Sequence, residues 1–378
     1  MQHVNHDASP LVAIGIVSAA PYLQRRDAVR DTWLRYPEIG SGEIVARFVV
    51  ARPLNEREAA TAQAEAQKTG DMIVFRTGVS GRVWSPLHTA FRWLQHAASN
   101  VPFRDAQYIA KMDDDAYLII PEFARHLRQM RNVPQTAPQR NVYAGIFYYA
   151  AYMPNSFTEV GAGYTLLTAN QNNGECIRAG TCEGSFPFTT GSMQLISRPL
   201  AHALASAPTT AAHIESSKPL VKDTRRSAAY EDVWMGYALW SLLHVRDLTL
   251  VNLDRFNYYF DQRTKPTMKN TTILVHMTTK PGRNTLEREK FLGERIHAAH
   301  RFALRQHCAS NGTLACNTFH PPSCRRNTNF TALCLNRAQR YLSKYSYACS
   351  LSPDRRVCPN GQAYEILERS PRTNTSKP

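Results

Sequence analysis

Short apolar runs alternate with helix-like segments over the first 130 residues, and this alternation restricts the fold more than any other feature of the chain. The first run, residues 11–18, is rich in β-branched residues and short enough to be a strand buried on both faces. Strands that alternate with helices are typical of an open, mostly parallel α/β sheet flanked by helices. The predicted strands are 11–18, 44–50, 72–75 and 107–112, and the predicted helices are 25–36, 55–68, 87–98 and 121–130.

The pattern becomes irregular from residue 141 onward. We predict a strand at 143–149 and then a long Gly/Asn-rich loop that passes through Cys176 and Cys182. The chain is expected to divide into an N-terminal tail at 1–10, an α/β domain at 11–300 and a Cys-rich C-terminal appendage at 301–378. Further strands are predicted at 193–196, 248–251 and 273–277, and further helices at 231–243 and 284–306.

The cysteines bear on the cellular compartment. Six of the eight lie in the last 71 residues, and none belongs to the close C-x₂₋₄-C pairs that zinc sites prefer. An even number at loop-like spacing indicates a disulfide framework, with Cys176 expected to pair with Cys182. Four N-x-[ST] sequons agree with a lumenal or extracellular protein; the alternative is a cytosolic chain with unpaired thiols. The remaining cysteines are Cys308, Cys316, Cys324, Cys334, Cys349 and Cys358, and the sequon asparagines are Asn270, Asn311, Asn329 and Asn374.

The chain is basic, with 45 Lys and Arg against 30 Asp and Glu, which gives a formal charge of +15. Residues 301–378 carry 12 basic and 3 acidic side chains, so the C-terminal region contributes +9 of this charge. A basic protein can bind nucleic acid, an anionic glycan, a nucleotide or a membrane surface. No nucleic-acid-binding motif is present, so we expect no nucleic-acid partner. The longest early apolar run has ten residues, so membrane attachment would need an anchor absent from this sequence.

Three acidic residues, Asp113-Asp114-Asp115, follow the predicted strand at 107–112. Adjacent carboxylates repel one another unless a cation or basic groups compensate. A hard divalent ion held by one or two carboxylates and by substrate phosphate oxygens would do so. Ligands of open α/β sheets bind beyond the carboxyl ends of the strands, which is where the triplet lies. The alternative is a solvated acidic turn.

Two further features could carry chemistry. Glu231-Asp232 opens a predicted helix, where acidic residues also stabilise the helix dipole. His276 ends a predicted strand, where a histidine is often an ordinary core residue but can also ligate a transition metal such as Mn²⁺.

Taken together and in this order, these segments resemble the β-1,3-glycosyltransferase family, which includes β-1,3-galactosyltransferases, β-1,3-N-acetylglucosaminyltransferases and Fringe. The resemblance extends from about Leu11 to Met277. Beyond the first strand, two segments match patterns of the family: RRDAVRDTW at 25–33 matches RR-x-x-[IV]-R-x-T-W, and KMDDD at 111–115 matches K-x-DDD. The other segments that carry the resemblance are AFRW at 90–93, FPFTTGS at 186–192, EDV at 231–233 and LVH at 274–276.

The resemblance implies a GT-A type nucleotide-sugar transferase fold, with 11–130 as the nucleotide-sugar-binding half and 131–300 as the acceptor half. It implies an inverting transfer of galactose or N-acetylglucosamine from a UDP-sugar to a glycan hydroxyl in β-1,3 linkage. The cofactor would be Mn²⁺ or another divalent cation. The acceptor would be a glycan on a glycoprotein, on a glycolipid or free in solution, and the location would be the Golgi lumen.

The resemblance also assigns roles to residues. Asp115 and His276 would bind the metal together with Asp113, and Asp232 would be the general base that deprotonates the acceptor hydroxyl. The expected nucleotide-sugar contacts are Asp113, Asp114, Arg25, Arg26, Arg30 and Lys111, and the expected contacts with the donor or acceptor sugar are Glu231, Gly191 and Ser192.

The rival interpretation is a non-catalytic lumenal protein that holds an anionic glycan with its basic C-terminal region. Asp115 and Asp232 argue against it, because a pure binder needs neither a metal ligand nor a base.

Overall fold

The computed structural model of the protein describes residues 9–79, 85–222, 231–253, 258–261, 272–277, 291–301, 303 and 347–350. The domain limits predicted after residues 10, 130 and 300 stay predictions. Cys349 lies on a short described strand, but its side chain is not among the described ones. The other predicted C-terminal disulfide cysteines and the sequon asparagines lie outside the described residues: Cys308, Cys316, Cys324, Cys334, Cys358, Asn270, Asn311, Asn329 and Asn374.

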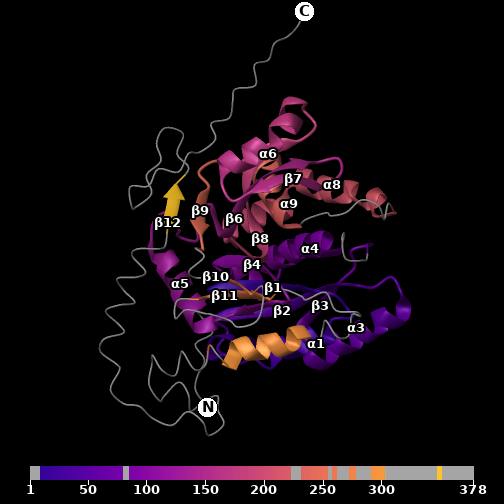
Figure 1. Cartoon of the computed structure of the whole chain (residues 1–378). Coiled ribbons are helices and arrows are strands. Elements are labelled where there is room, and N and C mark those ends of the chain that lie inside the picture. Colours follow the sequence, from indigo (N-terminus) through magenta and orange to yellow (C-terminus); the bar gives the residue numbers. More distant parts are fainter. Residues whose placement is uncertain are drawn as a thin grey trace, which may run out of the picture.

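Four parallel strands form one half of the central sheet (Figure 1). In spatial order they are β4 (Tyr108–Asp113), β1 (Val12–Ser18), β2 (Ile44–Ala51) and β3 (Met72–Phe75). The α/β class and the mostly parallel sheet flanked by helices are therefore confirmed. The helices between these strands are α1 (Leu23–Arg30), α2 (Pro37–Gly40), α3 (Glu56–Thr69) and α4 (Ser85–Ser99).

The other half of the sheet is mixed in direction. Beyond β4 it contains β8 (Glu183–Ser197), β6 (Val142–Met153), β9 (Thr249–Asn252) and β12 (Tyr347–Ser350), with β7 (Thr158–Gly163) paired to β6. Strand β8 runs antiparallel to both β4 and β6, whereas β6 and β9 are parallel. A separate small sheet joins β10 (Tyr258–Asp261), β11 (Leu274–Met277) and β5 (Ala116–Leu118).

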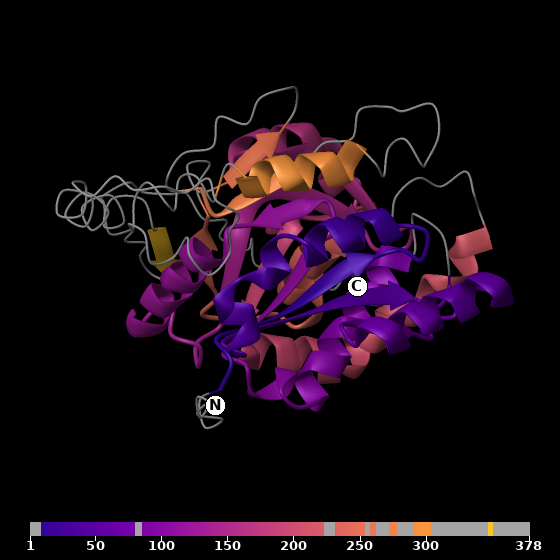
Figure 2. The same cartoon turned by 90° about the horizontal axis from the view of Figure 1, so that it is seen from below.

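Helices cover both faces of the central sheet, so its side chains are buried on both sides. Val12 and Ile14 of β1 point into one core, together with residues of α1 and α5 (Ile120–Asn132). Ala13 points into the other, with residues of α4, α7 (Arg198–Ser206), α8 (Pro208–Ser216) and α9 (Glu231–Tyr237). A helix described over 291–301 lies beside α1 (Figure 2), where a Cβ on Gly293 would contact Ala28.

Gly15 allows α4 to lie directly on β1. A Cβ at this position would lie 2.5 Å from ring atoms of Trp93, closer than side-chain atoms approach one another. The indole of Trp93 donates a hydrogen bond of 2.9 Å to the carbonyl of Ala110 on β4, so one side chain joins α4 to two strands. In the described part of the chain, no helix has both the length and the apolar character needed to cross a bilayer.

Two sequence-based predictions of secondary structure were wrong. The segment interpreted as a long loop contains β7 and the helix α6 (Leu166–Arg178). Its Asn and Gly content suggested a loop, but the Thr165 side chain caps α6 by accepting a hydrogen bond from the Thr168 amide. The helix predicted at 25–36 ends at Arg30 instead, followed by a 3₁₀ turn at Trp33–Arg35. The hydroxyl of Thr32 donates to the Ala28 carbonyl, which competes with the helical hydrogen-bond pattern.

The disulfide between Cys176 and Cys182 is present, as predicted from the sequence. It links the last turn of α6 to the segment just before β8. The disulfide therefore ties α6 to the sheet that carries the candidate site.

Candidate active site

The acidic triplet forms the turn between β4 and β5. Asp113 is the last residue of β4 and lies opposite Val17 of the parallel strand β1. Parallel strands end at a common edge, and this is the edge at which open α/β sheets bind ligands. The triplet thus occupies the position expected from the sequence.

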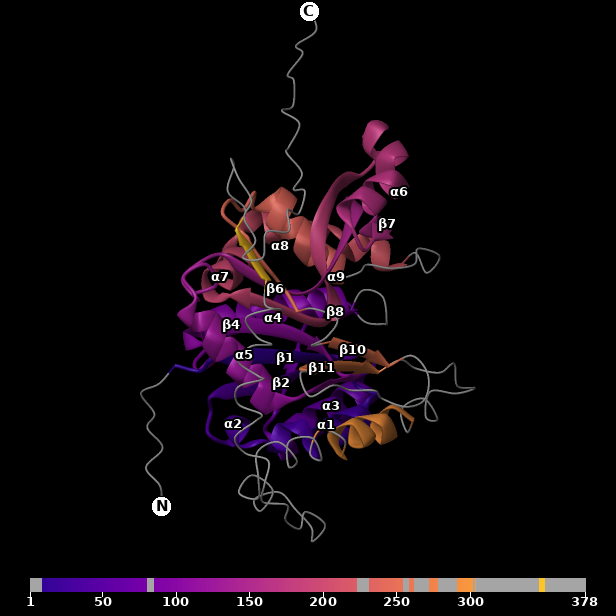
Figure 3. The same cartoon turned by 60° about the vertical axis from the view of Figure 1, so that its left-hand side comes forward.

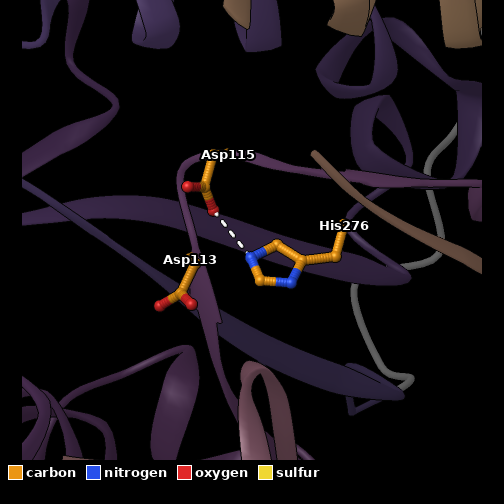
Figure 4. A group of neighbouring side chains, drawn as sticks. All are labelled: Asp113, Asp115 and His276. Atoms are coloured by element: carbon orange, nitrogen blue, oxygen red, sulfur yellow. Dashed lines mark ion pairs between the residues drawn. The ribbon is translucent and has the colours of Figure 1, made fainter. Parts of the chain in front are cut away.

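Asp113, Asp115 and His276 converge at this edge (Figure 4). Each offers one ligand atom, and these atoms all lie within 4.8 Å of one another. His276 is brought there by the small sheet, because β11 pairs with β5 so that His276 lies opposite Ala116, the residue after the triplet. Its Nε2 lies 3.3 Å from Asp115 Oδ1.

The chemistry of this group fits a divalent cation. Asp115 Oδ1 is buried, and apart from the ion pair with His276 it has no hydrogen-bond partner among the described residues. Burial favours the neutral carboxyl, but the contact with His276 and the charges of Arg25 and Lys111 together outweigh it and hold the pKa of Asp115 below its usual value. Burial also lowers the pKa of His276, yet Asp115 raises it above the ordinary value. Two carboxylates and one imidazole form a donor set suited to an ion such as Mn²⁺.

Asp114 is not a member of this group and instead joins the end of β1 to α1. Its carboxylate accepts a hydrogen bond of 2.6 Å from the Ser18 hydroxyl and one of 2.8 Å from Arg25. Burial raises the pKa of Asp114, and the Arg25 charge partly opposes this. The Arg25 guanidinium also lies 3.8 Å from Asp115. Arg25 is therefore a fixed positive charge at the rim of the acidic turn.

Arg26 and Arg30 both bind carboxylates of α3 or of the segment that follows it. Arg26 is fully buried and binds Glu65 through two nitrogens, at 2.8 and 2.6 Å. Arg30 binds Asp71 through two nitrogens, at 2.8 and 2.9 Å. These contacts give both arginines a role in holding α1 against α3. A nucleotide contact from either one stays a prediction.

Lys111 connects the acidic turn to the start of α9. Its ammonium group is fully buried and donates to Asp113 at 2.6 Å, to Glu231 at 2.8 Å and to the Gly191 carbonyl at 2.9 Å. Burial would lower the pKa of Lys111, but the two carboxylates raise it above its ordinary value, so the group stays charged. Burial raises the pKa of Asp113 to about 6 even though the Lys111 charge opposes the shift.

Gly191 lets β8 approach this cluster closely. A Cβ there would lie 3.1 Å from both Asp113 Oδ2 and Lys111 Nζ, so a larger residue would press on the proposed metal ligand. The neighbouring Ser192 is buried, and its Oγ lies 2.9 Å from Oγ1 of Thr190. Gly191 is thus part of the site, whereas Ser192 supports it from inside β8.

Asp232 lies in the first turn of α9 and is partly exposed. Burial and the neighbouring charge of Glu231 raise the pKa of Asp232 to about 7. One carboxylate oxygen accepts a hydrogen bond of 2.9 Å from the Val233 amide. The Asp232 carbonyl accepts another, at 3.2 Å, from Gln194 of β8. The helix start is thereby fixed to the sheet, and the carboxyl titrates near neutral pH.

Sequence analysis missed three residues around the site. Ser18 ends β1 at the same edge as the triplet, and Gln194 is a buried polar residue within an apolar strand. The position of Ser18 at a strand end and the polar character of Gln194 within an apolar run are both visible in the sequence. Glu159 on β7, whose charge contributes to the raised pKa of Asp232, had no signal because its segment was interpreted as a loop.

An α/β sheet whose carboxyl edge carries three side chains that could hold a cation, with a near-neutral carboxyl at the start of α9, is compatible with a glycosyltransferase site. Sequence comparison matches residues 24–217, which are 194 of the 378 residues, to the Galactosyltransferase family. The chain belongs to this family, as the sequence resemblance predicted. Family and sheet topology together give the GT-A type fold expected from the sequence.

Two curated relatives come from Arabidopsis thaliana. The chain is 29% identical to hydroxyproline O-galactosyltransferase GALT2 over 134 residues, which cover 35% of this chain and 18% of that protein. It is 28% identical to beta-1,3-galactosyltransferase GALT1 over 123 residues, which cover 32% and 18%. The matched segments span less than a fifth of the length of either relative.

Solved structures with a similar arrangement share little sequence with this chain. The galactosyltransferase LgtC has a TM-score of 0.37 and 13% identity, with 75% of this chain and 95% of that chain covered. Mouse xyloside xylosyltransferase 1 has a TM-score of 0.33 and 12% identity, with 71% and 97% covered.

Proposed function

We propose that the protein is an inverting galactosyltransferase that moves galactose from UDP-galactose to a glycan hydroxyl in β-1,3 linkage, with Mn²⁺ as cofactor. The observation that supports this best is the arrangement around Lys111. This one buried ammonium binds Asp113 of the metal group and Glu231, the neighbour of Asp232. Lys111 would thus join the group that holds the nucleotide-sugar diphosphate to the start of the helix that activates the hydroxyl.

Asp232 would act as the general base. A carboxyl with a pKa of about 7 is ionised in part at neutral pH and accepts a proton more readily than an ordinary carboxylate. The acceptor oxygen attacks the anomeric carbon and its proton passes to Asp232. The bond from that carbon to the diphosphate breaks, and UDP leaves with the electron pair. Attack from the face opposite UDP inverts the configuration.

Asp113, Asp115 and His276 would hold Mn²⁺, which when bound supplies positive charge that stabilises the departing diphosphate. Arg25, at the rim of the acidic turn, would add a charge-assisted contact to the nucleotide. Lys111 would keep Asp113 ionised and in place. Gly191 and Glu231 border the same cluster and would contact the transferred sugar.

Galactose is preferred over N-acetylglucosamine because the family and the curated relatives are galactosyltransferases by name. The β-1,3 linkage is likewise carried over from the relative with that name. The Cys176–Cys182 disulfide supports an oxidising compartment, and we propose the Golgi lumen.

The test is UDP release by the purified protein with a panel of glycan acceptors, with UDP-galactose or UDP-N-acetylglucosamine as donor, and with and without Mn²⁺. We expect release with UDP-galactose that depends on both metal and acceptor. Asp115→Asn should abolish it, whereas Asp105→Asn, which alters an exposed carboxylate in the turn after α4, should not. Equal release by Asp115→Asn and the parent protein would contradict the proposed site.

A further inference from the structure

A row of aromatic side chains leads from α9, the helix that carries Asp232, to the surface. Gly236 of α9 packs so closely on β8 that an added Cβ would lie 2.7 Å from the Cβ of Phe188. The ring of Phe188 lies 6.1 Å from that of Tyr148 on β6, and Tyr148 lies 4.6 Å from Tyr164, which follows β7. The row therefore begins under the catalytic helix and ends on the β7–α6 lobe, residues 158–178, which projects from the body beside α9 (Figure 3).

The outer end of this row is strongly exposed. Tyr164 is 77% exposed, and Leu167, one turn further along, is 64% exposed. Single exposed apolar side chains are common and need no explanation. Here, however, Tyr164 is the outer member of a stack that continues inward through Tyr148 and Phe188. An apolar surface of this kind beside a catalytic site indicates a place where a ligand binds.

The lobe holds this surface in a fixed position. Gly161 has a positive φ, and a Cβ there would lie 2.1 Å from the Asn173 side chain of α6. A Cβ on Gly163 would lie 2.8 Å from the backbone of α6. Helix α6 thus packs directly on β7, and the Cys176–Cys182 disulfide secures its far end. A rigid surface loses little conformational entropy when a ligand binds.

The lobe also carries a carboxylate, Glu159. Glu159 on β7 is partly buried, and its charge contributes to the raised pKa of Asp232. A carboxylate on this strand can accept hydrogen bonds from hydroxyl groups of an acceptor.

We propose that Tyr164, Tyr148 and Leu167 form a stacking subsite for a saccharide ring of the acceptor, beyond the ring that receives galactose. This inference rests on the proposed function. A saccharide ring has C–H faces that pack on an aromatic surface and hydroxyl edges that reach a carboxylate such as Glu159. The glycan acceptor of the proposed function makes a saccharide the expected occupant; a proline-rich extended peptide also docks on aromatic side chains, so the experiment includes such peptides.

The experiment measures acceptor binding directly, in the presence of UDP and Mn²⁺. A printed array of oligosaccharides and hydroxyproline-rich peptides identifies the saccharide that the protein binds best, and calorimetry then gives its Kd. Tyr164→Ala should raise Kd by about 5- to 10-fold, as expected for loss of a stacking tyrosine. Tyr164→Phe keeps the ring and should keep the affinity. Leu54→Ala removes another strongly exposed apolar side chain, just before α3, and is the control.

Transfer kinetics add a second readout, because loss of a binding subsite in Tyr164→Ala should raise KM for the bound oligosaccharide with little change in kcat. An unchanged Kd in a folded Tyr164→Ala protein would overturn the inference, and so would an array on which the protein binds peptides but no saccharide. A protein that binds saccharide through Tyr164 but transfers no sugar would contradict the proposed function and leave the subsite standing.

Discussion

Lys111→Met should destabilise the protein far more than the loss of an ordinary lysine. The Lys111 side chain has no exposed surface and donates three hydrogen bonds, two of them to carboxylates. Methionine nearly fills the same volume but leaves Asp113 and Glu231 without their shared cation. The substitution therefore isolates the charge from the packing.

The magnitude follows from the burial of the pair. Removal of one partner of a buried ion pair costs about 3–5 kcal/mol, because the other charge remains without compensation. In a domain of this size each kcal/mol shifts the midpoint of thermal unfolding by about 2–4 °C. A shift of roughly 10 °C is therefore expected. Lys218→Met is the matched control: Lys218 forms an exposed ion pair with Glu215, and such pairs contribute about 0–1 kcal/mol.

Calorimetric melting of both variants at neutral pH provides the comparison. The double variant Lys111→Met/Glu231→Gln should regain part of the lost stability, because one of the two uncompensated carboxylates is then neutral. If Lys111→Met melts within about 2 °C of Lys218→Met, a difference below 1 kcal/mol, Lys111 is not the electrostatic link of the site.

Four further outcomes are expected. Because Asp232 works only when ionised and its pKa in the ligand-free protein is about 7, the logarithm of kcat/KM should fall with a slope of about one as pH drops below 7 and level off above it; a flat profile from pH 5 to 8 would exclude this base. The same raised pKa means that ionised Asp232 costs stability, so Asp232→Asn should gain stability relative to the parent as pH rises from 5 to 8, measured by melting. Non-reducing mass spectrometry of secreted protein should find Cys176 linked to Cys182 and the six C-terminal cysteines oxidised. Cys176→Ser should lower stability by about 2 kcal/mol, since the bridge closes a short loop.

The strands of the parallel half of the fold could be predicted from the sequence because they are buried on both faces. Such strands appear as uninterrupted apolar runs, and β1 to β4 were predicted to within two residues at each end. Strand β8 was predicted only at 193–196, because its first half mixes aromatic residues with Gly, Pro and Thr. Its pairing with β6 is a tertiary effect that local propensity does not reveal.

The site was only partly predictable for a related reason. Asp113, Asp115 and Asp232 stand in motifs, and so does His276 at a strand end. The role of Lys111 as a bridge depends on Gly191 and Glu231, which are 80 and 120 residues away in the chain. Contacts of that range follow from the fold and not from spacing. Sequence-based reasoning also could not separate Arg25, at the acidic turn, from Arg26 and Arg30, which bind carboxylates of α3 and its flank.

The most direct test of the central claim compares Asp232→Asn with Asp115→Asn in two assays, calorimetric UDP affinity with Mn²⁺ and the initial rate of galactose transfer. Asp232→Asn should lower kcat by about 10²–10⁴-fold and leave UDP affinity nearly unchanged, because it removes the base and no metal ligand. Asp115→Asn should lose Mn²⁺-dependent UDP binding together with transfer. A folded Asp232→Asn protein with near-normal turnover would contradict the account.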